Sequence, residues 1–145
     1  MLVEHTSVFP ASVEVVFALL QRPETLSYIA RPFATFEPIR EVVSTWEVGS
    51  TSAYRFRLFG VIPYGTHTIH ILCFDPEGVS SRESNEHVPV WNHDIMLKAV
   101  DAKHTKYTDR VKIQAELKTV FVWLWANAFY AHRQRKWIKL LREEP

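Results

Sequence analysis

The sequence has few of the residues that mark several common classes of protein. It contains one cysteine, Cys73, among 145 residues, which excludes an intramolecular disulfide framework and fits a reducing compartment. The motifs Gly-x-Ser-x-Gly and His-Glu-x-x-His are absent, and the four glycines stand apart from one another. Because no glycine-rich loop is present to cradle phosphates, dinucleotide-binding and P-loop chemistry are excluded.

Neither sign of charge dominates: the chain has 17 Lys and Arg residues and 16 Asp and Glu residues, and its formal net charge is +1. No nucleic-acid partner is expected, because such proteins usually carry a strongly basic face. No uncharged apolar run approaches the roughly 20 residues of a transmembrane helix, and residues 1–5 do not begin a signal peptide. We therefore expect a cytoplasmic protein with one domain, residues 1–145, whose apolar fraction of 47% supports a sizeable core.

The hydrophobic pattern changes its period twice along the chain. Leu2–Phe9 alternates as a strand does, and Ser12 then caps a helix that continues to Leu20. Pro23 opens a second short helix, which ends at Arg31-Pro32. Beyond Glu116 the period is helical again as far as about Leu141.

Between these helices the pattern is that of strands separated by turn residues. Asp75-Pro76-Glu77-Gly78 is a strong turn signal, and Gly60–Gly65 and Pro89 predict two more turns. Strands without intervening helices form an antiparallel sheet. We therefore predict an α+β fold in which a curved seven-stranded antiparallel sheet wraps around the long C-terminal helix. The six strands that follow Leu2–Phe9 are predicted at Thr35–Val43, Ala53–Phe59, Thr66–Phe74, Val79–Glu86, Trp91–Val100 and Thr105–Ala115.

Three stretches carry a family resemblance: Phe9–Phe17 followed by Pro23-Glu24, then Tyr107–Val111, then Phe129–Arg133. With these stretches and this order of elements, the chain resembles the START-like superfamily (SRPBCC), which includes the birch-pollen allergens, polyketide cyclases and dehydrases, and lipid-transport proteins. The resemblance covers essentially the whole chain and implies a helix-grip fold with an apolar cavity between the sheet and the long helix. It does not imply a reaction, because members of the superfamily differ in function.

Strand alternation places two titratable side chains on inward faces. His93 shares a face with Trp91 and Ile95, and Asp109 shares a face with Tyr107 and Val111. A buried carboxylate needs a partner. Arg133 falls on the apolar side of the terminal helix, so the sequence predicts an Asp109–Arg133 ion pair.

This ion pair is open to three interpretations: it fastens the helix to the sheet, it holds the polar end of a ligand, or His93 acts as an acid or base beside Asp109. No catalytic residue is assigned, and His93 and Asp109 are the candidates. The residues predicted to contact a ligand are His93, Asp109, Arg133, Trp91, Tyr107, Phe129, Tyr54 and Phe56.

No metal or other cofactor is expected. His67 and His70 are three residues apart on a predicted strand, which places them on opposite faces. Cys73 shares a face with His67 and Ile69, and we interpret it as a small buried hydrophobic residue.

The predicted strand Val79–Glu86 is unusual because it is polar on both faces. If it pairs within the sheet, one polar set lines the cavity, either Ser81, Glu83 and Asn85 or Ser80, Arg82 and Ser84. The alternative is an exposed edge strand.

Three functional hypotheses follow. The first is the binding or transport of a small hydrophobic or amphipathic molecule, such as a lipid, a fatty acid or a polyketide. The second is a polyketide cyclase or dehydratase with His93 as general base. The third is a module for dimerisation or membrane contact, in which the start of the terminal helix exposes Phe121, Leu124 and Trp125.

Overall fold

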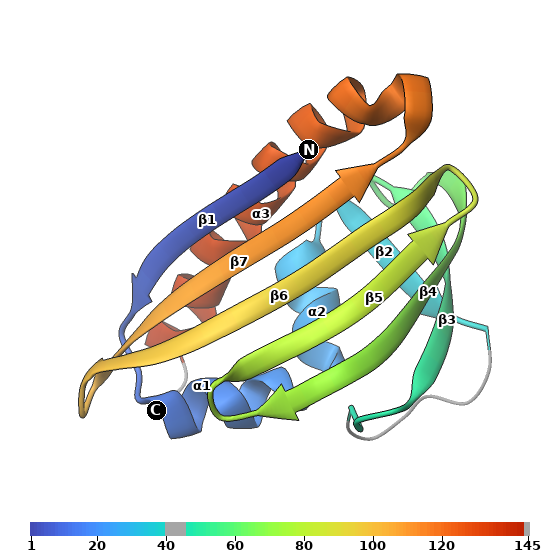
Figure 1. The fold of residues 1–145 in the computed structure, drawn as a ribbon. Helices are drawn as coiled ribbons and strands as arrows, with labels where there is room; N and C mark the ends of the chain where they lie inside the picture. Colours follow the sequence, from blue (N-terminus) through green and yellow to red (C-terminus); the bar gives the residue numbers. More distant parts are fainter. Residues whose placement is uncertain (40–45, 144–145) are drawn as a thin grey trace.

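Seven antiparallel strands form one curved sheet in the part of the chain that the structure, a computed structural model, describes: residues 1–39 and 46–143. The order across the sheet is β1-β7-β6-β5-β4-β3-β2, so all neighbours except β1 and β7 are consecutive in the chain. The predicted sheet is confirmed (Figure 1). The strands are β1 Leu2–Phe9, β2 Ala34–Pro38, β3 Thr51–Leu58, β4 Ile62–Asp75, β5 Gly78–Asn85, β6 Val88–Asp101 and β7 His104–Gln114.

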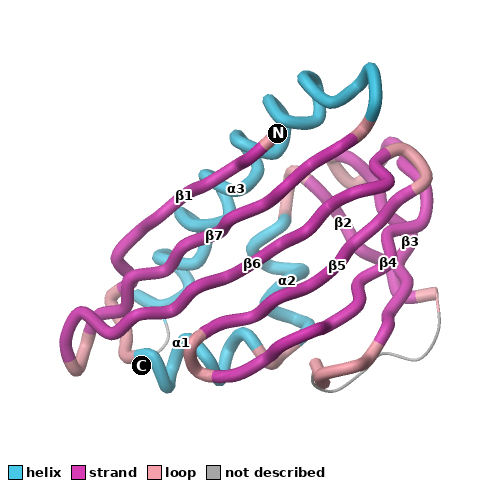
Figure 2. Tube along the Cα trace, viewed as in Figure 1, coloured by secondary structure: helices cyan, strands magenta, loops and turns pink. Residues whose placement is uncertain are grey.

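Within the same described ranges, three α-helices lie together on the concave side of the sheet (Figure 2). They are α1 (Val13–Leu20), α2 (Pro23–Ala30) and α3 (Thr119–Glu143), and a 3-10 turn at Glu116–Lys118 leads into α3. Helix α3 packs against β1 and against α2. The two short helices and the long terminal helix are thus confirmed, and the fold is the predicted α+β helix-grip.

Local sequence signals account for where several elements begin. The Ser12 hydroxyl accepts a hydrogen bond from the backbone N–H of Val15 at 3.3 Å, and Pro23 lies in the first turn of α2. The turn before β5 requires glycine at position 78, because a Cβ there would lie 2.0 Å from the carbonyl oxygen of Ile95. These starting points agree with the sequence prediction.

The inward side of α3 is the common wall of two hydrophobic clusters. Phe129 and Tyr130 belong to a cluster with Trp91 of β6, and Trp137 belongs to a second cluster with Phe9 and with residues of α1 and α2. All five side chains are buried. Helix α3 therefore holds the sheet and the short helices in one core.

The predicted turns at Gly60–Gly65 and at Pro89 are partly wrong. Strand β4 already begins at Ile62 and includes Pro63, and β6 begins at Val88 and includes Pro89. Pro63 lies beside the register shift in the pairing of β3 with β4, and Pro89 has no register partner on either neighbouring strand, so both stand where the ladder is irregular and proline is tolerated. Strand β2 ends at Pro38, and the remainder of the predicted strand Thr35–Val43 from residue 40 onward lies outside the described residues.

The prediction that Cys73 is buried is also wrong. Its side chain is exposed, because the pairing of β4 with β5 shifts register between Ile71 and Cys73. The bulge adds one residue to the alternation, so that both Leu72 and Cys73 are exposed and Phe74 turns back toward the core.

Candidate functional site

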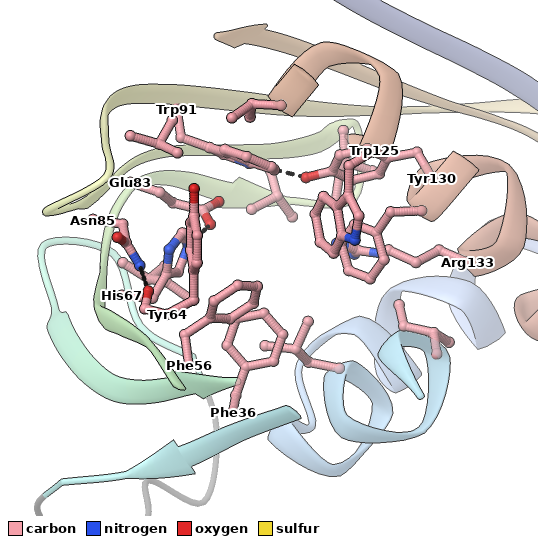
Figure 3. Close-up of a pocket in the computed structure, with 18 of the residues that line it drawn as sticks. Phe36, Phe56, Tyr64, His67, Glu83, Asn85, Trp91, Trp125, Tyr130 and Arg133 are labelled. Carbon is pink, nitrogen blue, oxygen red and sulfur yellow. Dashed lines mark hydrogen bonds and ion pairs between the residues drawn. The ribbon is translucent and has the colours of Figure 1, made fainter. Parts of the chain in front are cut away.

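A cavity of about 310 Å³ lies between α3, α2 and the sheet (Figure 3). It is at the lower end of the size range of ligand pockets, roughly 300–1,000 Å³. Most of its wall is apolar, and aromatic side chains from the sheet face others from α3. The main aromatic residues of the wall are Phe36, Phe56, Trp91, Trp125, Phe129 and Tyr130.

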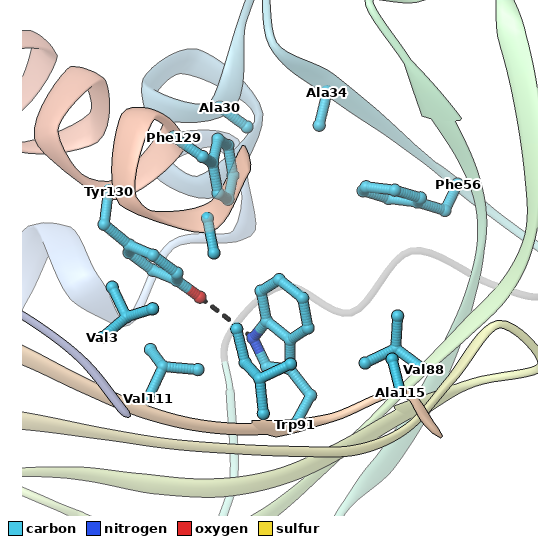
Figure 4. Close-up of a cluster of buried hydrophobic side chains, with 12 residues drawn as sticks. Val3, Ala30, Ala34, Phe56, Val88, Trp91, Val111, Ala115, Phe129 and Tyr130 are labelled. Atoms are coloured by element: carbon cyan, nitrogen blue, oxygen red, sulfur yellow. Dashed lines mark hydrogen bonds between the residues drawn. The ribbon is translucent and has the colours of Figure 1, made fainter. Parts of the chain in front are cut away.

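One hydrogen bond joins the two aromatic sides of this wall. The indole N–H of Trp91 on β6 donates to the Tyr130 hydroxyl on α3 at 3.0 Å (Figure 4). Both side chains are buried, and the bond satisfies the polar atom of each. It therefore fixes the distance between the helix and the sheet beside the cavity.

On the sheet side, the polar part of the wall comes from two neighbouring strands. Glu83 and Asn85 of β5 line the cavity together with His67 of β4, and Ser81 is buried beside them. Of the two polar sets considered for this strand, the inward one is therefore Ser81, Glu83 and Asn85. Strand β5 lies between β6 and β4, so it is not an edge strand. The cavity is amphipathic.

Glu83 is the centre of this polar group. Its carboxylate lies 2.7 Å from Nε2 of His67 and 3.6 Å from Nδ1 of His93, and the Ser81 hydroxyl donates to it at 2.6 Å. Burial alone would raise the pKa of Glu83, but the hydrogen bonds from His67 and His93 hold it well below its usual range. Glu83 is therefore a buried carboxylate that is ionised at neutral pH.

Behind Glu83, His93 connects the cavity wall to a second buried carboxylate. Nε2 of His93 lies 2.7 Å from Oδ1 of Asp109, and the Gln134 amide donates to Oδ2 of Asp109 at 3.1 Å. Burial opposes the charge on each partner, but the shared hydrogen bonds prevail, so the pKa of His93 is raised and that of Asp109 is lowered. The chain His67–Glu83–His93–Asp109 thus alternates histidines with carboxylates from the cavity wall into the core.

The predicted ion pair between Asp109 and Arg133 is wrong. Asp109 is paired with His93 and Gln134, and no ion pair joins it to Arg133. The guanidinium instead lies over the ring of Tyr130, 4.9 Å from its centroid. The reason is the rotation of α3 about its axis: Gln134, one residue further along, faces β1 and β7 and occupies the position beside Asp109 that was predicted for Arg133.

The structure separates the predicted ligand-contacting residues into two groups. Four of them line the cavity, namely Phe56, Trp91, Phe129 and Arg133. The other four are buried but are not part of the lining: Tyr54, His93, Tyr107 and Asp109. For His93, Tyr107 and Asp109, strand alternation predicts the inward orientation.

Several lining residues were missing from the predicted set. His67 had a usable signal, because it alternates with Ile69 and Ile71 on the inward face of β4. Tyr64 and Tyr130 had none, since they lie in segments whose inward side depends on the packing of partner elements. Trp125, which only the third hypothesis placed on an exposed surface, is half-buried and lines the cavity.

The buried network predicts how stability depends on pH. His93 has a raised pKa, so its contribution is complete below the unfolded value of about 6.5 and is lost as the pH rises through the higher folded value. Glu83 and Asp109 have lowered pKa values, so their contributions are complete above about pH 4.5 and are lost in acid. The free energy of unfolding is therefore expected to be greatest between about pH 4.5 and 6.5.

Urea unfolding at a series of pH values tests this expectation. Above pH 6.5 the His93 contribution predicts a decline of up to about 1.4 kcal/mol per pH unit. A His93→Gln variant should lack this alkaline decline. An unchanged slope in the variant would show that His93 does not carry the extra proton.

Residues 1–39 and 46–143 contain neither a cluster of metal-binding side chains nor a helix able to span a membrane. Across these residues no group of three or more His, Cys, Asp or Glu side chains is placed to hold a metal ion. In the same residues, no helix is both long enough and apolar enough to cross a bilayer.

The fold has clear structural relatives. A START superfamily protein from Mycobacterium smegmatis superposes with a TM-score of 0.78 at 10% identity, with 99% of each chain covered. The Zhui aromatase/cyclase from Streptomyces sp. R1128 has a TM-score of 0.62 at 17% identity, covering 97% of this chain and 90% of that one. The Aha1 dimer from Colwellia psychrerythraea has a TM-score of 0.68 at 15% identity, covering 97% and 96%. The protein therefore has a START-like fold of the SRPBCC type.

The sequence itself matches one family model. Residues 8–141 match the model described as Domain of unknown function (DUF8410), and the chain belongs to this family. No curated protein matches the sequence.

Proposed function

We propose that this protein binds a small hydrophobic or amphipathic molecule in the cavity between α3 and the sheet. The observation that carries the proposal is the cavity itself, about 310 Å³ of space lined mainly by apolar side chains, with a polar group on the sheet and Arg133 on α3. Protein cores are packed as densely as organic crystals, and voids larger than a water molecule are few. Space of this size and lining is typical of a ligand site.

The composition of the wall supports this proposal energetically. Burial of the apolar surface of a ligand supplies roughly 25 cal/mol per Å² before the costs of association are subtracted. The polar side chains His67, Glu83 and Asn85 are already held by one another and by the backbone, so they are oriented before a ligand arrives. Such pre-organisation lowers the cost of binding.

The alternative of a cyclase with His93 as general base has less support. His93 is not a lining residue, and its two ring nitrogens face Asp109 and Glu83. A general base must come within hydrogen-bond reach of its substrate. The likeness to the Zhui aromatase/cyclase is one of fold, at 17% identity.

The third hypothesis, a module for dimerisation or membrane contact, depends on the exposure of residues at the start of α3. Phe121 is 76% exposed and Leu124 is 55% exposed, and Phe121 also lines the cavity. This position makes Phe121 part of the cavity opening, which accounts for its exposure without a partner chain. A homodimer stays a prediction.

Native mass spectrometry of gently purified protein tests the proposed function, followed by organic extraction of any bound molecule. We expect a mass above that of the bare chain and one class of extracted amphiphile. A Val122→Trp variant, altered at a lining residue of α3, should lower occupancy at least about tenfold by filling the space.

Val120→Trp is the matched control, because Val120 is exposed, lies two residues earlier on α3 and does not line the cavity. This variant should keep the occupancy of the wild-type protein. Equal loss in both variants, or a wild-type protein that stays bare after incubation with lipids and polyketides, would contradict the proposal.

A further inference from the structure

Arg133 is a buried cation on the wall of the cavity. It lies on α3, is 6% exposed, and belongs to the lining residues (Figure 3). Among the residues that the structure describes, it forms no ion pair, and its Nε has no hydrogen-bond partner. Its guanidinium carbon lies over the rings of Tyr130 and Phe129, at 4.9 and 5.5 Å from their centroids. A buried charge without a polar partner is costly, so its presence needs a reason.

The nearby acids do not supply that partner. Asp109 is held by His93 and Gln134, and Glu83 is held by His67 and Ser81. Both carboxylates are thus engaged by other donors, and they act on Arg133 only at longer range. The guanidinium remains available to an anion that enters the cavity.

The rest of the α3 wall also presents buried hydrogen-bond donors without acceptors. The indole N–H groups of Trp125 and Trp137 are buried without a hydrogen-bond partner in the described structure, and both residues line the cavity. An indole N–H, like a guanidinium, donates hydrogen bonds and accepts none. The Tyr107 hydroxyl is the other buried side-chain atom without a partner in those residues, and it is not part of the lining. The α3 wall is therefore short of acceptors.

We propose that the ligand is a carboxylic acid whose carboxylate pairs with Arg133 on α3, while its apolar body lies against the aromatic wall. This inference rests on the proposed function, since it names the class of ligand for the same cavity. Arginine suits this role because its planar fork matches a carboxylate in geometry and charge. The carboxylate supplies the acceptor that α3 lacks, and Phe56 and Trp91 face the body from the sheet side.

Calorimetry with matched pairs of probes tests the inference. Decanoic acid is compared with decanol, and naphthylacetic acid with naphthylethanol, so that aliphatic and aromatic bodies are distinguished. In the wild-type protein we expect the acid of at least one pair to bind about 10- to 100-fold more tightly than its alcohol, as charge-assisted hydrogen bonds predict.

Two variants of Arg133 test whether this residue causes the preference for acids over alcohols. Arg133→Gln keeps a donor but removes the charge, and it should abolish the acid preference while leaving alcohol affinity within about threefold. Arg133→Lys should keep part of the preference. Arg135→Gln is the matched control, because Arg135 is exposed on the same helix and does not line the cavity. It should bind as the wild-type protein does.

The outcomes separate this inference from the proposed function. Equal binding of acids and alcohols by the wild-type protein overturns the inference and leaves the proposed function standing, and this comparison needs no variant to fold. An acid preference that survives in Arg133→Gln also overturns the inference. If no probe binds and the purified protein is bare, both the inference and the proposed function fail.

Discussion

An Asp109→Ala variant is expected to lose about 3–5 kcal/mol of the free energy of unfolding. Asp109 is 1% exposed, and its two oxygens accept hydrogen bonds from His93 at 2.7 Å and Gln134 at 3.1 Å. Removal of the carboxylate leaves a buried imidazole and a buried amide without their acceptor. Breaking one side of a buried charged pair is costly for this reason. Urea unfolding monitored by circular dichroism measures the loss.

Glu4→Ala is the matched control for this prediction. Glu4 accepts a hydrogen bond from Arg110 at 3.0 Å on the neighbouring strand, but both side chains are exposed. Exposed pairs contribute about 0–1 kcal/mol, so this variant should remain within that range of the wild-type protein. If Asp109→Ala proved as mild as Glu4→Ala, the buried network would contribute little to folding.

A Trp137→Ala variant is expected to lose a similar amount, about 3–5 kcal/mol. Trp137 is fully buried on α3, where its ring packs against Phe9 of β1 at 5.6 Å and Tyr107 of β7 at 5.7 Å between centroids. Its deletion leaves a cavity at the point where the helix meets the first and last strands. The rigid packing of these neighbours limits how far the space can close. Thermal unfolding followed by near-UV circular dichroism reports the effect.

Phe121→Ala provides the comparison, since it removes an aromatic side chain of the same helix that is 76% exposed. Surface substitutions of this kind usually change stability by no more than about 0.5 kcal/mol. A loss for Trp137→Ala that does not exceed the loss for Phe121→Ala would contradict the assignment of Trp137 to the core.

Most of the fold was predictable because its signals are local. The strand alternation, the Ser12 cap and Pro23 each act within a few residues, and they predicted the type and order of the elements correctly. The bulge before Cys73 was not predictable in this way. It arises from the pairing of β4 with β5, so the residue at which the alternation shifts depends on a partner strand.

The site shows the same limit at the level of side chains. Alternation correctly turned His93 and Asp109 inward, because that needs only the strand period. The choice of partner for Asp109 depended on the rotation of α3 against β1 and β7, and here Gln134 rather than Arg133 reaches it. Neighbouring positions on a helix differ by about 100°. Sequence periodicity alone does not resolve which of the two faces the carboxylate.

The pairing of β1 with β7 makes the order of synthesis matter for folding. Strand β1 is made before every other strand, yet its neighbour in the sheet is the last strand to be made. Until His104–Gln114 has left the ribosome, Val3 and Phe9 have no strand to pair with. Contacts so distant in sequence form late and slow the folding of a domain. The nascent chain therefore carries an unpaired β1 while β2 to β6 are made, and chaperones that shield such strands are expected to raise its folding yield.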